Sequence, residues 1–198
     1  MIDDLTLSEM RRSGRDDTAW LRFRDRATKH AERRDRTILL STCERFTLLS
    51  TRTPIAKPDA GPDAPDRGVT LRGTDAARAV LRTAAGLESR HVGETAVLGQ
   101  IRAAWARQRD ALDATLRHLG VRATRAGRLA RAVHGYADTD HGYAAAAARG
   151  IRAWADAHGT PTPEVAIAGT GSIARAIADL AASHMLRVTA YSRHSERL

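Results

Sequence analysis

Residues 37–46 read Thr-Ile-Leu-Leu-Ser-Thr-Cys-Glu-Arg-Phe, an apolar run rich in strand-forming residues that ends at the only cysteine of the chain. A second run of the same kind, Phe46 to Thr51, follows directly after Cys43, Glu44 and Arg45. Threonine, isoleucine and phenylalanine are enriched in β-strands. The two runs therefore predict neighbouring strands of a small sheet, with Cys43 at a strand end or in a hairpin.

Cys43 has two interpretations on the residues alone. A thiol becomes a nucleophile when a positive or hydrogen-bonding neighbour lowers its pKa, and Arg45 and Thr42 stand close enough in sequence to do so. The sulfur would then attack an activated carbonyl. A free cysteine is also commonly a small buried hydrophobe. Both interpretations stay open at this point.

The composition indicates a folded protein, because 42% of the 198 residues are hydrophobic. One cysteine cannot form an intramolecular disulfide, and the first thirty residues hold no apolar segment long enough for a signal peptide or a membrane span. We therefore expect a cytoplasmic protein with no membrane partner. Lys and Arg number 32 against 23 acids, a net charge of +9. This excess indicates either a polyanionic partner such as RNA or only the arginine-rich composition of a GC-rich genome.

Outward from the sheet, the N-terminal third is expected to hold an arm, a helix and a loop. Residues 1–15 are polar without a clear period and predict an irregular arm. A helical apolar stripe predicts an amphipathic helix that ends near residue 34 and packs on the sheet. The prolines between residues 54 and 65 predict a loop. The stripe consists of Trp20, Phe23, Ala27 and Ala31.

The middle of the chain predicts four helices. Thr74 is the expected cap of the first, and Gly86 marks its end. The second opens between residues 86 and 100, and Glu94 lies on its apolar face, where a carboxylate is either a helix cap or part of a site. The others are predicted at 124–136 and 143–158. The apolar face of the second helix consists of Leu98, Ile101, Trp105 and Leu112.

A glycine turn lies near the C-terminal end of the sequence. Residues 159–163 predict a linker, 165–168 a buried strand, the stretch through 182 a helix, and 187–191 a second strand. The turn between the first strand and the helix reads Gly-x-Gly-x-x-Ala from Gly169, which is the pattern that admits a pyrophosphate at a helix N-terminus. Arg193 follows the second strand where an acid is usual in NAD sites, which favours NADP. A β-α-β unit that only packs, without a nucleotide, is the alternative.

These motifs together resemble the glutamyl-tRNA reductase family over residues 37–198. The resemblance rests on their order along the chain, and its middle part is the most specific. The motifs are Ser41-Thr42-Cys43-Glu44-Arg45, Gly86-Leu87-Glu88-Ser89, Gly93-Glu94, Leu98-Gly99-Gln100, Thr139-Asp140, the glycine turn and Ser192-Arg193.

The resemblance implies that a thiolate attacks the ester carbonyl of glutamyl-tRNA and that NADPH reduces the thioester to glutamate-1-semialdehyde, a step of tetrapyrrole synthesis. By resemblance, Cys43 is the nucleophile, and the partner is glutamyl-tRNA or another aminoacyl-tRNA. The residues that match positions around the glutamyl group are Thr42, Arg45, Ser89, Glu94 and Gln100. Those that match the NADPH side are Gly169, Gly171, Ser172, Ser192 and Arg193.

The sequence departs from the family pattern at several positions. The family's opening histidine motif has no counterpart in residues 1–15, Glu44 replaces an asparagine, and Ala79 replaces a histidine. The alternative function is a diverged homologue that does not reduce, either a cysteine acyl transferase or esterase, or a protein that binds an aminoacyl-tRNA or a partner.

The expected fold class is α/β in two domains. An N-terminal α+β catalytic-type domain, with helices on a small antiparallel sheet, is predicted for 1–158, and an incomplete NADP-binding Rossmann β-α-β unit for 159–198. One β-α-β unit cannot enclose a dinucleotide, which leaves three alternatives. The sequence is a fragment, or a homodimer or partner subunit supplies the rest of the cofactor domain and the helical dimerisation domain, or cofactor binding has been lost.

Overall fold

The computed structural model of the chain describes residues 2–12, 17–32, 36–42, 44–51, 68–89, 92–94, 96–134, 143–169, 172–183 and 186–191. The chain forms two compact units. The first consists of Met1–Glu88 and Ala96–Ala130, and the second of Ser89–Thr95 and Arg131–Leu198. Among the described helices, none is long and apolar enough to cross a membrane.

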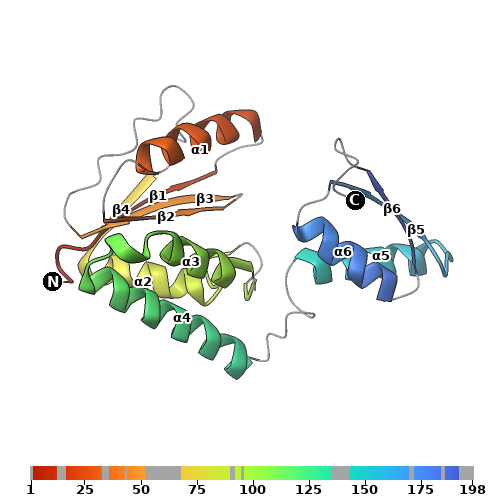
Figure 1. The fold of residues 1–198 in the computed structure, drawn as a ribbon. Helices are drawn as coiled ribbons and strands as arrows, with labels where there is room; N and C mark the ends of the chain where they lie inside the picture. Colours follow the sequence, from red (N-terminus) through yellow and green to blue (C-terminus); the bar gives the residue numbers. More distant parts are fainter. Residues whose placement is uncertain are drawn as a thin grey trace. The chain divides into compact units, whose positions relative to one another are not determined.

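The first unit is built on a four-stranded antiparallel sheet in the order β2-β3-β1-β4 (Figure 1). The strands are β1 (Thr6–Arg11), β2 (Thr37–Ser41), β3 (Arg45–Ser50) and β4 (Gly68–Arg72). In the register of β2 and β3, Ser41 faces Phe46. The predicted pair of strands on either side of Cys43 is therefore confirmed, with β3 beginning at Arg45.

The prediction of an irregular arm over residues 1–15 is wrong. Strand β1 occupies the interior of the sheet, between β3 and β4. Its side chains reach both faces of the sheet, because Leu7 lies in one core and Met10 in the other, and Leu5, directly before the strand, joins the core of Leu7. Pairing on both sides satisfies its backbone, so a strand with a polar sequence is stable here.

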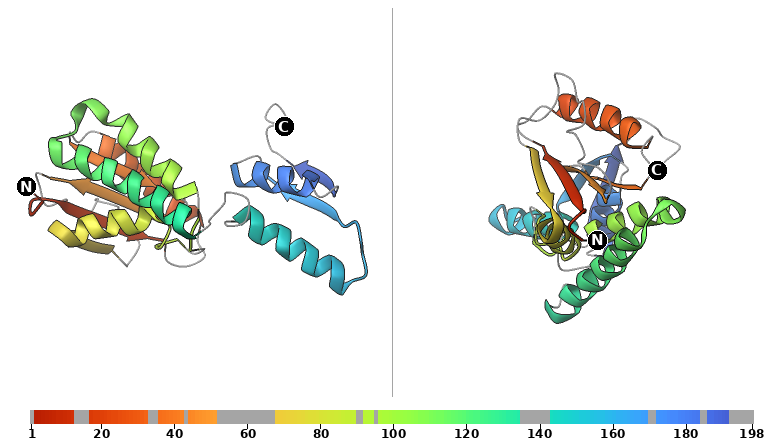
Figure 2. Two further views of the ribbon diagram at one scale, coloured as in Figure 1. Left: turned by 90° about the horizontal axis from the view of Figure 1, so that it is seen from below. Right: turned by 90° about the vertical axis from the view of Figure 1, so that its left-hand side faces the viewer.

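Helices cover both faces of this sheet, as Figures 1 and 2 show from three directions. Helix α1 (Asp17–Glu32) packs on one face, where the rings of Phe23 and Phe46 meet edge to face at a centroid distance of 5.5 Å. The predicted stripe of α1 is buried in that core. The other face carries α2 (Gly73–Ala84), α3 (Ala96–Arg107) and α4 (Ala114–His134).

Helix α2 ends as the sequence indicates but begins differently. Gly86 has φ +79°, its N–H bonds the Thr83 carbonyl, and the Leu87 N–H bonds the Arg82 carbonyl. This pair of hydrogen bonds is a Schellman motif, which needs a residue with left-handed backbone angles and so favours glycine. At the other end Arg72 occupies the N-cap position, so the predicted cap at Thr74 is wrong.

The predicted bounds of the next two helices need correction. Helix α3 ends at Arg107 and a 3₁₀ turn, η2 (Arg109–Ala111), follows, so Leu112 reaches the core from beyond the helix. Helix α4 begins at Ala114 rather than near residue 124, and Asp113 caps it by accepting the Leu116 N–H at 2.9 Å. Gly120 lies inside α4 because the Trp105 ring fills the space of its missing side chain.

The second unit contains α5 (Tyr143–Ala157), β5 (Glu164–Ala168), α6 (Ser172–Ser183) and β6 (Arg187–Tyr191). Strands β5 and β6 are parallel, with Val165 opposite Val188, and α6 connects them. The predicted β-α-β unit is confirmed as a fold. Helix α5 contacts α6 in the same compact unit, whereas the domain boundary predicted after residue 158 stays a prediction.

Candidate functional site

The connection between β2 and β3 is shaped by Thr42. Its hydroxyl oxygen accepts the backbone N–H groups of Glu44 at 3.3 Å and Arg45 at 3.0 Å. Its own N–H donates to the Arg45 carbonyl at 2.8 Å. Cys43, the predicted nucleophile, lies outside the described residues. Thr42 therefore fixes the chain immediately before and after Cys43 in sequence, which is a structural task for a residue predicted to bind substrate.

Arg45 is the centre of a buried polar network. The residue is only 7% exposed, and its guanidinium donates to the Thr83 hydroxyl at 2.7 Å and to the Glu88 carbonyl at 2.6 Å. Its Nε lies 3.4 Å from Oε2 of Glu9. A guanidinium donates hydrogen bonds to several acceptors in fixed directions, so one arginine can link several elements. Arg45 thus ties β3 to β1, to the end of α2 and to the turn that follows α2.

Glu9 is the buried carboxylate of this network, at 9% exposure. Besides Arg45, it accepts from Nε of Arg11 at 2.6 Å and from the Thr47 hydroxyl at 3.2 Å. Burying a carboxylate is costly unless charged and hydrogen-bonding partners surround it. The antiparallel register supplies these partners, because it places Glu9 opposite Thr47 and Arg11 opposite Arg45.

Glu88 extends the network to the surface. Its two carboxylate oxygens accept from Nη2 of Arg11 at 2.8 Å and from Nε of Arg82 at 2.6 Å. Burial alone would raise the pKa of Glu88, but the hydrogen bonds and charges of these arginines outweigh it and lower that pKa. Burial alone would lower the pKa of Arg11, but its hydrogen bonds to Glu88 and Glu9 and the charges of these carboxylates outweigh that effect and raise the pKa. Glu88 is therefore held ionised between two arginines.

A cleft of about 360 Å³ opens beside this network. Its charged lining consists of three acids and three arginines that are paired with one another, and Arg78 bonds Asp75 at 2.7 Å in addition to the pairs above. Ala79, which stands where the family has a histidine, also lines the cleft. A methyl group there can neither donate nor accept a proton. The whole lining is Leu7, Glu9, Arg11, Val69, Leu71, Asp75, Arg78, Ala79, Arg82, Thr83 and Glu88.

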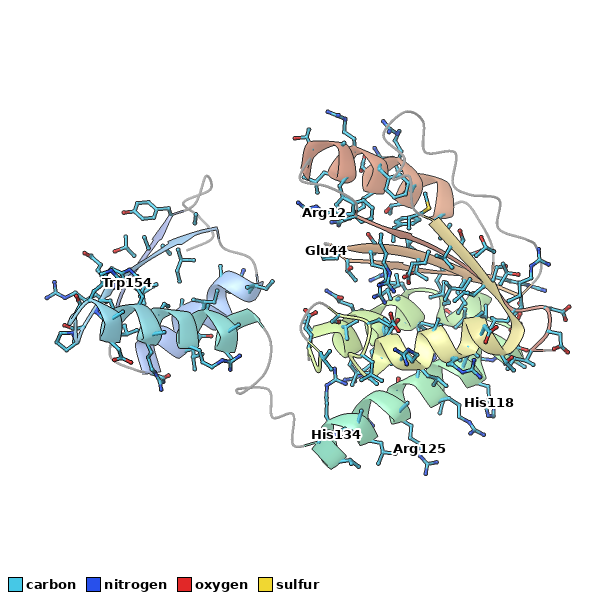
Figure 3. All side chains as sticks on the ribbon, turned by 180° about the vertical axis from the view of Figure 1, so that it is seen from behind. Arg12, Glu44, His118, Arg125, His134 and Trp154 are labelled. Atoms are coloured by element: carbon cyan, nitrogen blue, oxygen red, sulfur yellow. The ribbon has the colours of Figure 1, made fainter. Side chains whose placement is uncertain are left out.

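Glu44 lies next to a cation. Its carbonyl accepts the Arg12 N–H at 3.0 Å, and its carboxylate is 3.8 Å from the Arg12 guanidinium; both side chains are labelled in Figure 3. The sequence places this carboxylate directly after Cys43. Arg12 offsets a negative charge that would otherwise oppose ionisation of a neighbouring thiol.

Three other predicted substrate residues are not brought into the network. Gln100 lies on the exposed side of α3, whereas the buried side carries Val97, Leu98, Ile101 and Ala104. Ser89 and Glu94 belong to the second compact unit. Glu94 precedes the start of α3, so it is not on the helix face as predicted, and its backbone carbonyl accepts from Arg131 at 2.8 Å. Their roles stay predictions.

The glycine turn is described at its first glycine. Gly169 has φ +118°, its N–H donates to the Tyr191 carbonyl at 2.8 Å, and the space a side chain would take is open. A glycine is required by that φ, and the open space permits close approach of a phosphate. Ser172 opens α6. Gly171, Ser192 and Arg193 lie outside the described residues, so their part in cofactor binding stays a prediction.

The residues that sequence analysis missed are Glu9, Arg11 and Thr83. The first two come from β1, whose alternation of Leu5 and Leu7 with Thr6 and Ser8 is the strand period that could have revealed it. Thr83 carries no such signal, because it is one polar position in an otherwise apolar helix face. In the described part of the chain, no three His, Cys, Asp or Glu side chains gather as they would at a metal ion.

A family model and several known proteins are similar to this chain. The family model of the glutamyl-tRNA reductase N-terminal domain matches residues 11–134. The glutamyl-tRNA reductase of Aeropyrum pernix is 40% identical over 78 residues, which are 37% of this chain and 19% of that protein. That of Pyrobaculum aerophilum is 46% identical over 67 residues, 33% of this chain and 17% of that protein.

One solved structure shares the fold. Glutamyl-tRNA reductase from Methanopyrus kandleri superposes with a TM-score of 0.60 at 22% identity, over 98% of this chain and 51% of that one. The chain thus spans about half the length of this relative. Because the family model covers more than half of the 198 residues, the chain belongs to the glutamyl-tRNA reductase family through its N-terminal domain.

Proposed function

We propose that this chain acts on the aminoacyl ester of glutamyl-tRNA in the cytoplasm, as part of tetrapyrrole synthesis, with Cys43 as nucleophile and NADPH as reductant. The observation that carries the proposal is the family match over residues 11–134, which includes Cys43, Arg45 and Glu88. The structure supports it by the buried network that holds the β2–β3 connection against the turn after α2. A homodimer or partner subunit stays a prediction.

The first step would be acyl transfer to sulfur. The Cys43 thiolate attacks the ester carbonyl, a carbon–sulfur bond forms, and the carbon–oxygen bond to the terminal ribose breaks; the ribose oxygen leaves and takes up a proton. In this step Thr42 holds the backbone of Glu44 and Arg45, which follow Cys43 in sequence, and Arg12 balances the charge of Glu44. Arg45 acts through position, because its guanidinium already serves Thr83, Glu88 and Glu9.

The proposed NADPH site lies at the glycine turn of the second unit, where Gly169 supports it. Gly169 has the positive φ and the open space that let a phosphate approach the backbone, beside the start of α6. Gly171, Ser172, Ser192 and Arg193 would complete the contacts, with Arg193 on the 2′-phosphate. NADPH, when bound, supplies the hydride that turns the thioester into an aldehyde and frees the Cys43 sulfur.

A second candidate function is acyl transfer or ester hydrolysis without reduction, or binding of an aminoacyl-tRNA alone. Ala79 favours it, because this cleft-lining position carries a methyl where the family carries an imidazole. The Ala79 side chain cannot donate or accept a proton, so it cannot replace an imidazole in a reduction step.

Incubation of the 198-residue chain with glutamyl-tRNA separates the candidates. We would follow deacylation and semialdehyde with NADPH, with NADH and without either, and use a Cys43→Ser variant as the control. Semialdehyde that requires both Cys43 and NADPH supports the reductase. Deacylation that requires Cys43 but yields no semialdehyde supports the second candidate, and no difference from Cys43→Ser in any arm leaves only binding.

A further inference from the structure

Helix α4 carries charge of one sign along its whole length. Its residues 114–134 include five arginines and two histidines but no aspartate or glutamate. Helix α1, by contrast, mixes both signs, and its Lys29 is paired with Asp25. In the network described above, every arginine meets a carboxylate. Helix α3 also lacks acids but carries only Arg102 and Arg107, so the run of five arginines without an acid is a concentration of positive charge particular to α4.

The arginines of α4 share one exposed face. Successive helical residues turn by about 100°, so Arg117, Arg122, Arg125 and Arg128 fall within an arc of about 140°. All four are exposed, and the buried residues of α4 lie on the opposite side. Figure 3 shows Arg125 and His118 pointing away from the sheet. Within the described residues, none of these four arginines forms an ion pair.

We propose that this face, made by Arg117, Arg122, Arg125 and Arg128, binds the phosphate backbone of the tRNA. The inference rests on the proposed function, in that the partner is the tRNA whose ester is the substrate. Four unpaired guanidinium groups spread over about 16 Å of helix can each meet a phosphate and release counterions. Phosphate contacts position a nucleic acid without reading its sequence. The face would therefore hold the body of the tRNA while its aminoacyl end is used elsewhere.

The competing occupant is an acidic protein surface, since Val121 and Leu129 are exposed among the arginines, at 69% and 60%. The charges favour RNA. The face offers four cations and no anion, and a protein surface that neutralised all four would need a matching cluster of acids. Binding of tRNA and binding of an acidic protein predict different dependences of the affinity on salt and different effective competitors.

The test is the affinity of the full 198-residue chain for deacylated glutamate tRNA, measured by fluorescence anisotropy from 50 to 300 mM salt. The variant is Arg122→Ala with Arg125→Ala and Arg128→Ala. The matched control, Arg22→Ala with Arg26→Ala and Lys29→Ala, removes the same charge from α1, on the other face of the sheet (Figure 1). Alanine favours helices, so both triple variants should fold, and circular dichroism checks this.

We expect the α4 variant to lose about tenfold or more in affinity at 100 mM salt. The slope of log affinity against log salt should fall by about two to three units, because three phosphate contacts are removed, with much smaller changes in the control. Equal losses in both variants, or no tRNA binding by the unchanged chain at 50 mM salt, would overturn the proposal. So would competition by poly-glutamate as effective as that by tRNA at equal charge. Deacylated tRNA has no ester, so Cys43→Ser should bind it normally, and a failure of the Cys43 chemistry is thereby distinguished from a failure of this surface.

Discussion

Replacing Arg45 by alanine tests the buried network most directly. The change removes two hydrogen bonds, to Thr83 and to the Glu88 carbonyl, and the closest cation to one carboxylate oxygen of Glu9. Breaking a buried ion pair by removing one partner costs about 3–5 kcal/mol. Glu9 keeps Arg11 and Thr47, so we take the lower end. The first unit should lose about 3 kcal/mol, read from urea unfolding.

The control for this experiment is Arg82→Ala. Arg82 also bonds a carboxylate of the network, but its side chain is 52% exposed and its partner Glu88 keeps Arg11. Its loss should cost about 0.5 kcal/mol, as for other exposed pairs. Arg45→Lys should fall between, because one ammonium group cannot reach Thr83 and the Glu88 carbonyl with the geometry of a guanidinium. If Arg45→Ala came within about 1 kcal/mol of Arg82→Ala, the network would not hold the unit together as argued.

Three further predictions follow from single residues. Cys43 should react with iodoacetamide in the native chain, and labelling only in denaturant would make it a buried hydrophobe. Glu88 and Asp113 have pKa values below their ordinary values of 4.5 and 3.8. Their ionised forms therefore stabilise the fold fully above pH 4.5, and this stabilisation is lost as the pH falls through the lower folded values. Glu88→Gln should make the free energy of unfolding less dependent on pH in this range, and an unchanged profile would contradict this. A methyl at Gly127 would lie 2.6 Å from a backbone oxygen of α2, so Gly127→Ala should cost about 2–3 kcal/mol, whereas Gly99→Ala, in open space, should cost nothing.

The sequence predicted the parts of the fold that have a clear local pattern. The strands on either side of Cys43, the stripe of α1, the glycine stop of α2 and the β-α-β unit all have periodicity or turn residues that need no tertiary contact to interpret. It did not predict β1 or the start of α4. Strand β1 can carry the polar residue Glu9 in a buried position because Arg45 and Thr47 of the neighbouring strand contact its carboxylate. Gly120 sits inside a helix because the Trp105 ring covers it.

The candidate site was predictable only in part, for a similar reason. Thr42 and Arg45 stand out beside Cys43 in sequence, and the resemblance to the family points to the same positions. Their partners, Glu9 and Thr83, come from elements far away in sequence and are joined to Arg45 only by the register of the sheet and the end of α2. The burial of Arg45, and with it its role as a junction, cannot be inferred without that register.

Acyl transfer to Cys43 leaves a covalent adduct that can be measured directly. We would mix the chain with glutamyl-tRNA, quench in acid, and measure the intact mass and the modified peptide. We expect a mass increase of one glutamyl residue located on Cys43. The increase should be absent in Cys43→Ser and should be reversed by neutral hydroxylamine, as for a thioester. Deacylation of the tRNA without any adduct on Cys43, at equal rates in the chain and in Cys43→Ser, would contradict it.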